Sequence, residues 1–129
     1  MFPHPRPESI DFFERSISNH SKTRWLERLE DCHYVIHRKG LPSYEVLITD
    51  YYTLGLADYL EIKEEYPLIQ GIVTLSNWNG YTHQAKATAK QQNVGIFIMS
   101  ELLGALNWNE PHKYIKKDPE GNIVFFGKC

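Results

Sequence analysis

Cysteine is scarce in this sequence, with Cys32 and Cys129 as its only two examples among 129 residues. A disulfide framework needs more cysteines, and a cysteine at a chain end is usually too mobile to staple a core. Long apolar runs are also missing, since no segment approaches the ~20 apolar residues that a transmembrane helix needs. The proline-rich start MFPHPRPESIDFF is unlike a signal peptide. We therefore expect a cytoplasmic protein without a membrane span.

A strong charge of either sign is absent as well. The net charge is −2 and the isoelectric point is about 6.3, which gives no general attraction for DNA, RNA or an anionic membrane. The net charge does not exclude a local basic patch that binds nucleic acid. The hydrophobic fraction of 42% and the charged fraction of 23% are ordinary for a globular protein. At this length we expect one hydrophobic core and one α/β domain over residues 1–129.

Several motifs of known chemistry are missing. Neither a glycine-rich phosphate loop nor a Gly-x-Ser-x-Gly nucleophile elbow occurs. His33 and His37 are four residues apart, a spacing that suits a metal ion on a helix. Their segment is aromatic and β-branched at its centre and predicts a strand, on which they would lie about 13 Å apart. The adjacent Cys32 does not repair this spacing, and a zinc site is not expected.

The first third of the chain predicts an extended arm, two helices and a strand. Prolines at positions 3, 5 and 7 make residues 1–7 the arm, and Pro7 suits the first turn of a helix. Residues 8–18 carry apolar side chains at helical spacing, as do residues 22–31, where Trp25, Leu26 and Leu29 are expected to be buried. The strand is expected over residues 33–37.

The rest of the chain predicts a parallel sheet. Apolar runs near residues 44–49, 71–76 and 94–99 do not alternate with polar residues, which is typical of strands buried on both faces. Helical patterns over 54–65, over 83–92 with Thr82 as N-cap, and after Ser100 have the lengths of crossover connections. We therefore expect a three-layer α/β fold, with helices on both faces of a short, mostly parallel sheet. A C-terminal β-hairpin is expected over 113–127.

Ligands of open parallel sheets bind beyond the carboxyl ends of the strands. The candidate ligand-binding residues at these ends are Asp50, Tyr52, Asn77, Trp78, Asn79, Tyr81, Thr82 and Glu101. The same residue types are also what turns and helix caps require. Asp50 is the most informative of them, because a carboxylate there could hold a divalent metal ion, act as a base or cap the following helix.

Residues 71–106 resemble the C-terminal half of Mrr-type domains of the restriction-endonuclease-like superfamily. The resemblance rests on the helix start Tyr81-Thr82-His83-Gln84-Ala85, on the short apolar strand that follows, and on Ser100-Glu101-Leu102-Leu103 at the last helix. It implies a nuclease scaffold, a phage-defence or mobile-element setting, and N-terminal strands that extend the sheet antiparallel. These strands could instead pack separately.

The resemblance also implies a magnesium site, made by an Asp and by an acidic or Gln residue, x and Lys on adjacent strands. The residue types of this motif occur in Glu61-Ile62-Lys63, preceded by Asp50 and Asp58. Its apolar spacing is helical, however, whereas the motif needs a strand. A catalytic set of Asp50, Glu61 and Lys63, with Mg²⁺ at Asp50, is therefore one hypothesis, and a scaffold that has lost the chemistry is the one we favour.

Three functions follow as expectations. The first is a non-catalytic interaction or binding module, whose protein partner or second copy would contact the exposed aromatic residues Trp78, Tyr81 and Trp108. The second is the metal-dependent nuclease. The third is a small-molecule or nucleotide binder that uses the strand ends.

Overall fold

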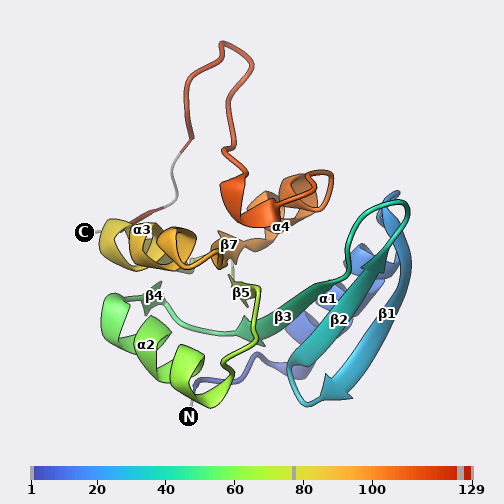
Figure 1. Cartoon of the computed structure of the whole chain (residues 1–129). Coiled ribbons are helices and arrows are strands. Elements are labelled where there is room, and N and C mark those ends of the chain that lie inside the picture. The colour runs from blue at the N-terminus through green and yellow to red at the C-terminus, as the bar shows by residue number, and fades with distance from the viewer. Residues whose placement is uncertain (1, 77, 125–126, 129) are drawn as a thin grey trace.

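The computed structural model describes residues 2–76, 78–124 and 127–128, with no account of the side chains of the last two. Its centre is a five-stranded mixed sheet of order β1-β2-β3-β5-β7 (Figure 1). The first three strands run antiparallel, and β3, β5 and β7 run parallel. The strands are β1 (Thr23–Glu30), β2 (His33–Arg38), β3 (Tyr44–Thr49), β5 (Gly71–Thr74) and β7 (Gly95–Ile98).

Four α-helices and a smaller sheet complete the mixed α/β fold. The helices are α1 (Pro7–Ser18), α2 (Leu56–Glu65), α3 (His83–Gln91) and α4 (Met99–Ala105), followed by the 3₁₀ turn η1 (Pro111–Lys113). The smaller sheet is parallel throughout and contains β4 (Thr53–Leu54), β6 (Gly80–Thr82) and β8 (Gly127–Lys128). None of the helices in the described part of the chain has the length and apolar character that crossing a bilayer requires.

The parallel half of the fold follows the sequence prediction closely. The three apolar runs form β3, β5 and β7, and the predicted crossover helices are α2 and α3. The Thr82 side chain accepts a hydrogen bond from the backbone N–H of Ala85, which confirms the predicted N-cap of α3. A Cβ at Gly71 would lie 2.7 Å from Cε2 of Tyr44, so only glycine allows this tyrosine to cross the neighbouring strand.

The predicted helix over residues 22–31 is wrong, because this segment is the edge strand β1. Trp25 and Leu29 were expected in the core but are 52% and 46% exposed. Their spacing fits a helix, yet hydrogen bonding to β2 across a two-residue turn determines the structure. Cys32 occupies this turn with a φ of 64°, a left-handed conformation usually taken by Gly or Asn.

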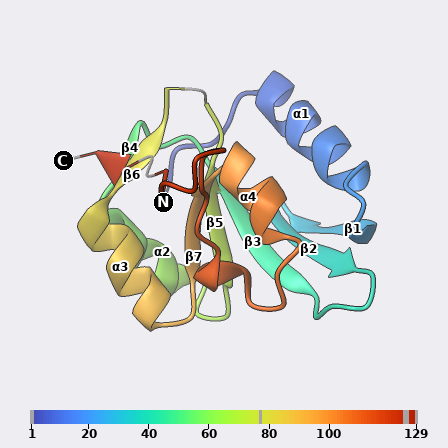
Figure 2. The same cartoon turned by 90° about the horizontal axis from the view of Figure 1, so that it is seen from above.

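The N-terminal strands extend the main sheet antiparallel, and α1 packs on them. The ring of Phe13 lies 5.1 Å from that of Tyr34, and Phe13 and Ile17 are buried as the helical pattern predicted. Figure 2 shows α1 beside β1 and β2, while α2 and α3 lie side by side at the other end of the sheet. The β7 end of the sheet contacts α3, α4 and η1, and a cavity opens there.

The predicted C-terminal hairpin is not confirmed. Over the described residues of 113–127, a single antiparallel bridge joins Lys117 to Ile123 around a turn. The carboxylate of Asp118 accepts hydrogen bonds from the backbone N–H groups of Glu120 and Asn122 in that turn. Residues 125–126 lie outside the described part of the chain. The strand β8 beyond them pairs with β6 instead.

Candidate functional site

The structure brings together Asp50 and Asn79 from the predicted strand-end set. The Asn79 amide donates to the Asp50 carboxylate at 2.9 Å and contacts the Thr74 hydroxyl at 3.0 Å. The hydroxyl in turn donates to the backbone carbonyl of Tyr51 at 2.7 Å. Asp50 does not cap the following helix α2. Gly55 is the N-cap residue of this helix, and its backbone N–H donates to the carboxylate of Asp58. These bonds fasten the carboxyl ends of β3 and β5 to each other.

The other predicted strand-end residues have different surroundings. Tyr52 and Trp78 are 67% and 77% exposed, and the Thr82 hydroxyl is used in capping α3. Asn77 falls outside the described residues. Tyr81, expected at an exposed aromatic surface, is fully buried, so that expectation was wrong. Its buried hydroxyl instead belongs to a second polar group, which contains Glu101.

Glu61 and Lys63 lie on α2, as their spacing predicted. The Lys63 ammonium donates to the backbone carbonyl of Pro67 at 2.6 Å. No strand that the structure describes carries an acidic-x-Lys sequence, since the residues two positions after Glu27, Glu30 and Glu45 are Leu29, Cys32 and Leu47. Within the described residues, no three His, Cys, Asp or Glu side chains are grouped to hold a metal ion.

Glu101, Lys86 and Tyr81 form a buried hydrogen-bonded cluster. One oxygen of Glu101 accepts from the Tyr81 hydroxyl at 2.7 Å and from the Lys86 ammonium at 3.1 Å. The other oxygen accepts from the backbone N–H of Ile98 at the start of α4. The ammonium also donates to the Ile96 carbonyl at 2.8 Å and to the Tyr81 oxygen at 3.1 Å. The Lys86 and Glu101 side chains are only 18% and 5% exposed.

The electrostatics of Lys86 reflect this burial. Loss of hydration lowers the pKa of Lys86 below its ordinary value, while attraction to Glu101 and the hydrogen bond between them oppose the decrease. The nearby ammonium of Lys90 lowers the Lys86 pKa further. A buried lysine whose pKa is changed by desolvation and by a specific charged partner, beside a cavity, is a physical indicator of a functional site.

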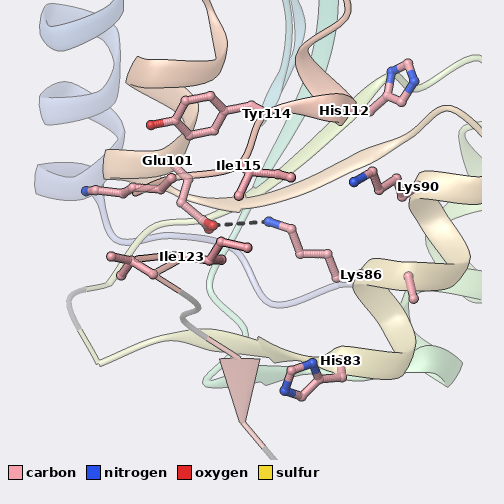
Figure 3. Close-up of a pocket in the computed structure, with 11 residues that line it drawn as sticks. His83, Lys86, Lys90, Glu101, His112, Tyr114, Ile115 and Ile123 are labelled. Atoms are coloured by element: carbon pink, nitrogen blue, oxygen red, sulfur yellow. Dashed lines mark hydrogen bonds and ion pairs between the residues drawn. The ribbon is translucent and has the colours of Figure 1, made fainter. Parts of the chain in front are cut away.

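A pocket of about 220 Å³ opens above this cluster (Figure 3). One of its walls is a single face of α3, because His83, Lys86, Ala87 and Lys90 follow the spacing of i, i+3, i+4 and i+7. The remaining lining residues come from α4, η1 and the C-terminal segment: Glu101, His112, Tyr114, Ile115, Lys116, Ile123 and Val124. Segments far apart in sequence therefore meet at this pocket, which we call the Lys86–Glu101 pocket.

The lining of the pocket is positively charged and partly apolar. Its three lysines and one glutamate give a formal charge of +2 with neutral histidines. The pKa of His112 is lowered, mainly by burial and also by Lys113 and Lys90, while Glu110 opposes this effect. Ile115 and Ile123 line the pocket although 40% and 66% of their surface is exposed.

Sequence reasoning selected Glu101 and Tyr81, which the structure brings together, but missed Lys86. Lys86 and Lys90 look like ordinary solvated helix residues, and the pairing of Lys86 with Glu101 depends on the path of β7 between α3 and α4. The available signal was the placement of His83, Lys86 and Lys90 on one helical face. No protein-family model, curated protein or solved structure matches this chain.

Proposed function

We propose that this chain is a non-catalytic α/β binding module that holds a small molecule in the Lys86–Glu101 pocket. The observation that carries the proposal is the buried Lys86–Glu101 ion pair at a cavity with both charged and apolar walls. Small-molecule sites are concave, with apolar walls and a few fixed polar groups that orient the ligand. A volume of about 220 Å³ is below the ~300–1,000 Å³ of typical ligand pockets and favours a compact ligand.

Binding is favoured over covalent catalysis because the polar groups of the pocket floor are already engaged. The Lys86 ammonium has three N–H groups and has three acceptors within 3.1 Å, namely Glu101, Tyr81 and the Ile96 carbonyl. A nucleophilic lysine needs a free lone pair, which this arrangement opposes. Both oxygens of Glu101 accept hydrogen bonds as well. These groups would form a rigid floor that positions a ligand.

We further propose that the module is built on a restriction-endonuclease-like scaffold without the nuclease chemistry. The resemblance implies N-terminal strands that extend the sheet antiparallel, and the antiparallel pairing of β1, β2 and β3 supports it. A three-layer arrangement would follow, as would a phage-defence or mobile-element setting that rests on the resemblance alone. The cytoplasm is the proposed compartment, and the buried free thiol of Cys32 suits its reducing conditions.

The nuclease alternative has weaker support. Its Asp50 is hydrogen-bonded to Asn79, and its Glu61 and Lys63 belong to a helix rather than to the strand that the motif needs. We expect no cleavage of DNA or RNA by the wild-type chain with Mg²⁺ or Mn²⁺. Cleavage that Asp50→Ala abolishes in a folded protein would contradict the proposal and establish the nuclease.

The proposed function is tested by a thermal-shift screen of small metabolites on three proteins. Ala87→Trp places a bulky side chain in the pocket from the exposed face of α3. Ala57→Trp is the matched control, because Ala57 is an exposed residue of α2 outside the pocket lining. A ligand of the pocket should raise the Tm of the wild type and of Ala57→Trp but not that of Ala87→Trp. The proposal fails if no compound makes this distinction.

A further inference from the structure

We infer that the Lys86–Glu101 pocket binds a small organic carboxylate, with its charge at Lys90 and His112 and its apolar body against Ile115 and Ile123. This inference rests on the proposed function and adds the chemical class of the ligand. It depends on three properties of the pocket lining: which charges are already paired, where the apolar side chains lie, and which anion-binding groups are missing.

The charge of the pocket selects an anion. Glu101 is the only acidic residue of the described lining, and Lys86 compensates it at 3.1 Å. The Lys90 ammonium is exposed and has no hydrogen-bond or ion-pair partner among the described residues. A cationic ligand would thus meet like charge, whereas an anion would compensate Lys90.

The position of the anion follows from Lys90 and His112. Figure 3 shows the Lys90 side chain extending from α3 into the pocket region, and His112 on η1 with its ring turned outward at the rim of the pocket. Lys86, Lys90 and His112 all line the same pocket, and the Lys90 charge lowers the pKa of the other two. An anion at this end would contact the Lys90 ammonium, and rotation of the His112 side chain would bring an imidazole N–H to it from a second element.

The rest of the pocket suits an apolar body. Ile115 and Ile123 belong to the C-terminal segment and leave 40% and 66% of their surface exposed. Ala87 of α3 and Val124 extend the same apolar lining. Covering such a surface contributes about 25 cal/mol per Å² of apolar area buried. The ligand is therefore expected to carry a short alkyl or aryl group.

A carboxylate fits this site better than a phosphate does. Strong phosphate sites usually combine lysine with arginine forks or with free N–H groups at a helix N-terminus. The described lining holds no arginine, and the Ala85 N–H at the start of α3 is occupied by the Thr82 hydroxyl. A single negative charge is matched by Lys90, and His112 can act as a second donor.

The experiment compares four probes by NMR titration at constant ionic strength: hexanoate, hexanamide, hexylammonium and inorganic phosphate. Hexanoate should shift the resonances of Lys90, His112 and Ile115, and hexanamide should bind about fivefold more weakly. Hexylammonium and phosphate should not bind at concentrations up to about 10 mM, which is tenfold above a Kd of ~1 mM for hexanoate.

Two variants separate the charged end from the apolar end. Lys90→Gln should weaken hexanoate binding about fivefold and leave hexanamide binding unchanged, because it removes only the ion pair. Lys39→Gln, at an exposed lysine outside the pocket lining, is the matched control and should change neither. Ile115→Ser should weaken both probes to a similar degree, because both carry the same alkyl chain.

Each unfavourable result has a distinct meaning. If hexanamide binds as tightly as hexanoate and Lys90→Gln has no effect, the carboxylate class is overturned while small-molecule binding stands. If phosphate binds and hexanoate does not, the ligand is a phosphate compound and the inference is overturned. If no probe binds, the inference is also overturned, and the comparison of Ala87→Trp with Ala57→Trp decides the proposed function independently.

Discussion

Two groups of polar residues in this molecule come from similar stretches of sequence but have different surroundings. At the ends of β3 and β5, Asp50 and Asn79 hydrogen-bond to each other at the partly exposed edge of the sheet. At the end of β7, Glu101 pairs with Lys86 under almost complete burial. Both groups include a strand-end carboxylate, yet only Glu101 lines the Lys86–Glu101 pocket.

The comparison shows that residue type at a strand end does not identify a site by itself. The Asp50 group connects two strands through the Asn79 amide and the Thr74 hydroxyl, which is a structural role. In the Glu101 group, the charges of Lys86 and Glu101 are buried together. Removing two charges from water costs free energy, and a purely structural role does not require this cost. Burial beside a cavity, rather than the presence of a carboxylate, therefore distinguishes the candidate functional site.

The largest expected effect comes from Glu101→Ala. This change leaves the Lys86 ammonium buried without its partner, which typically costs about 3–5 kcal/mol of unfolding free energy. Urea denaturation of the variant and the wild type measures the difference. A loss below ~1 kcal/mol would mean that the pair is effectively solvated, and the contrast with the Asp50 group would disappear.

The double variant Lys86→Met with Glu101→Gln is the control for this prediction. It removes both charges and keeps side chains of similar length, so it should be more stable than Glu101→Ala alone. If the double variant loses as much stability as the two separate changes added together, the residues are not coupled as a pair.

A smaller effect is expected at the other group. Asn79→Ala removes one amide from Asp50 and Thr74, and a typical neutral hydrogen bond contributes about 0.5–1.5 kcal/mol. Water can replace the amide at Asp50, which is only partly buried, so the low end of this range is expected. Urea denaturation checks the value. If Asn79→Ala lost as much unfolding free energy as Glu101→Ala, the Asp50 group and the Glu101 group would not differ in their energetics.

The parallel half of the fold was predictable because each of its strands is marked by the residue pattern within the strand itself. The runs in β3, β5 and β7 are apolar at consecutive positions, and this pattern indicates strands covered on both faces. The N-terminal hairpin was not predictable in the same way. Trp25, Leu26 and Leu29 fit a helical stripe, and the turn at Asp31 and Cys32 lacks the glycine or asparagine that marks most two-residue hairpin turns.

The pocket was only half predictable for a related reason. Glu101 could be selected because it follows an apolar strand, but Lys86 reads as an exposed helix residue in the sequence. The two meet because β7 carries the chain from the end of α3 back past the Lys86 side chain, which donates to Ile96 of that strand. Contacts of this kind depend on the crossover geometry and not on local residue spacing.

The smallest expected effect is a pH dependence at the edge of the pocket. The pKa of His112 is below its ordinary value of 6.5 in the folded chain, so the unfolded chain binds more protons just below pH 6.5. The contribution of His112 to stability should therefore rise with pH in this window, and His112→Gln should reduce that rise. Bound hexanoate should raise the pKa of His112, because an anion favours the protonated imidazole. The affinity of the pocket for hexanoate should therefore increase as pH falls toward this window. Urea denaturation and NMR titration at a series of pH values measure the two effects. A pH profile of affinity identical in the wild type and in His112→Gln would exclude the imidazole from the anion site and leave Lys90 to hold the charge alone.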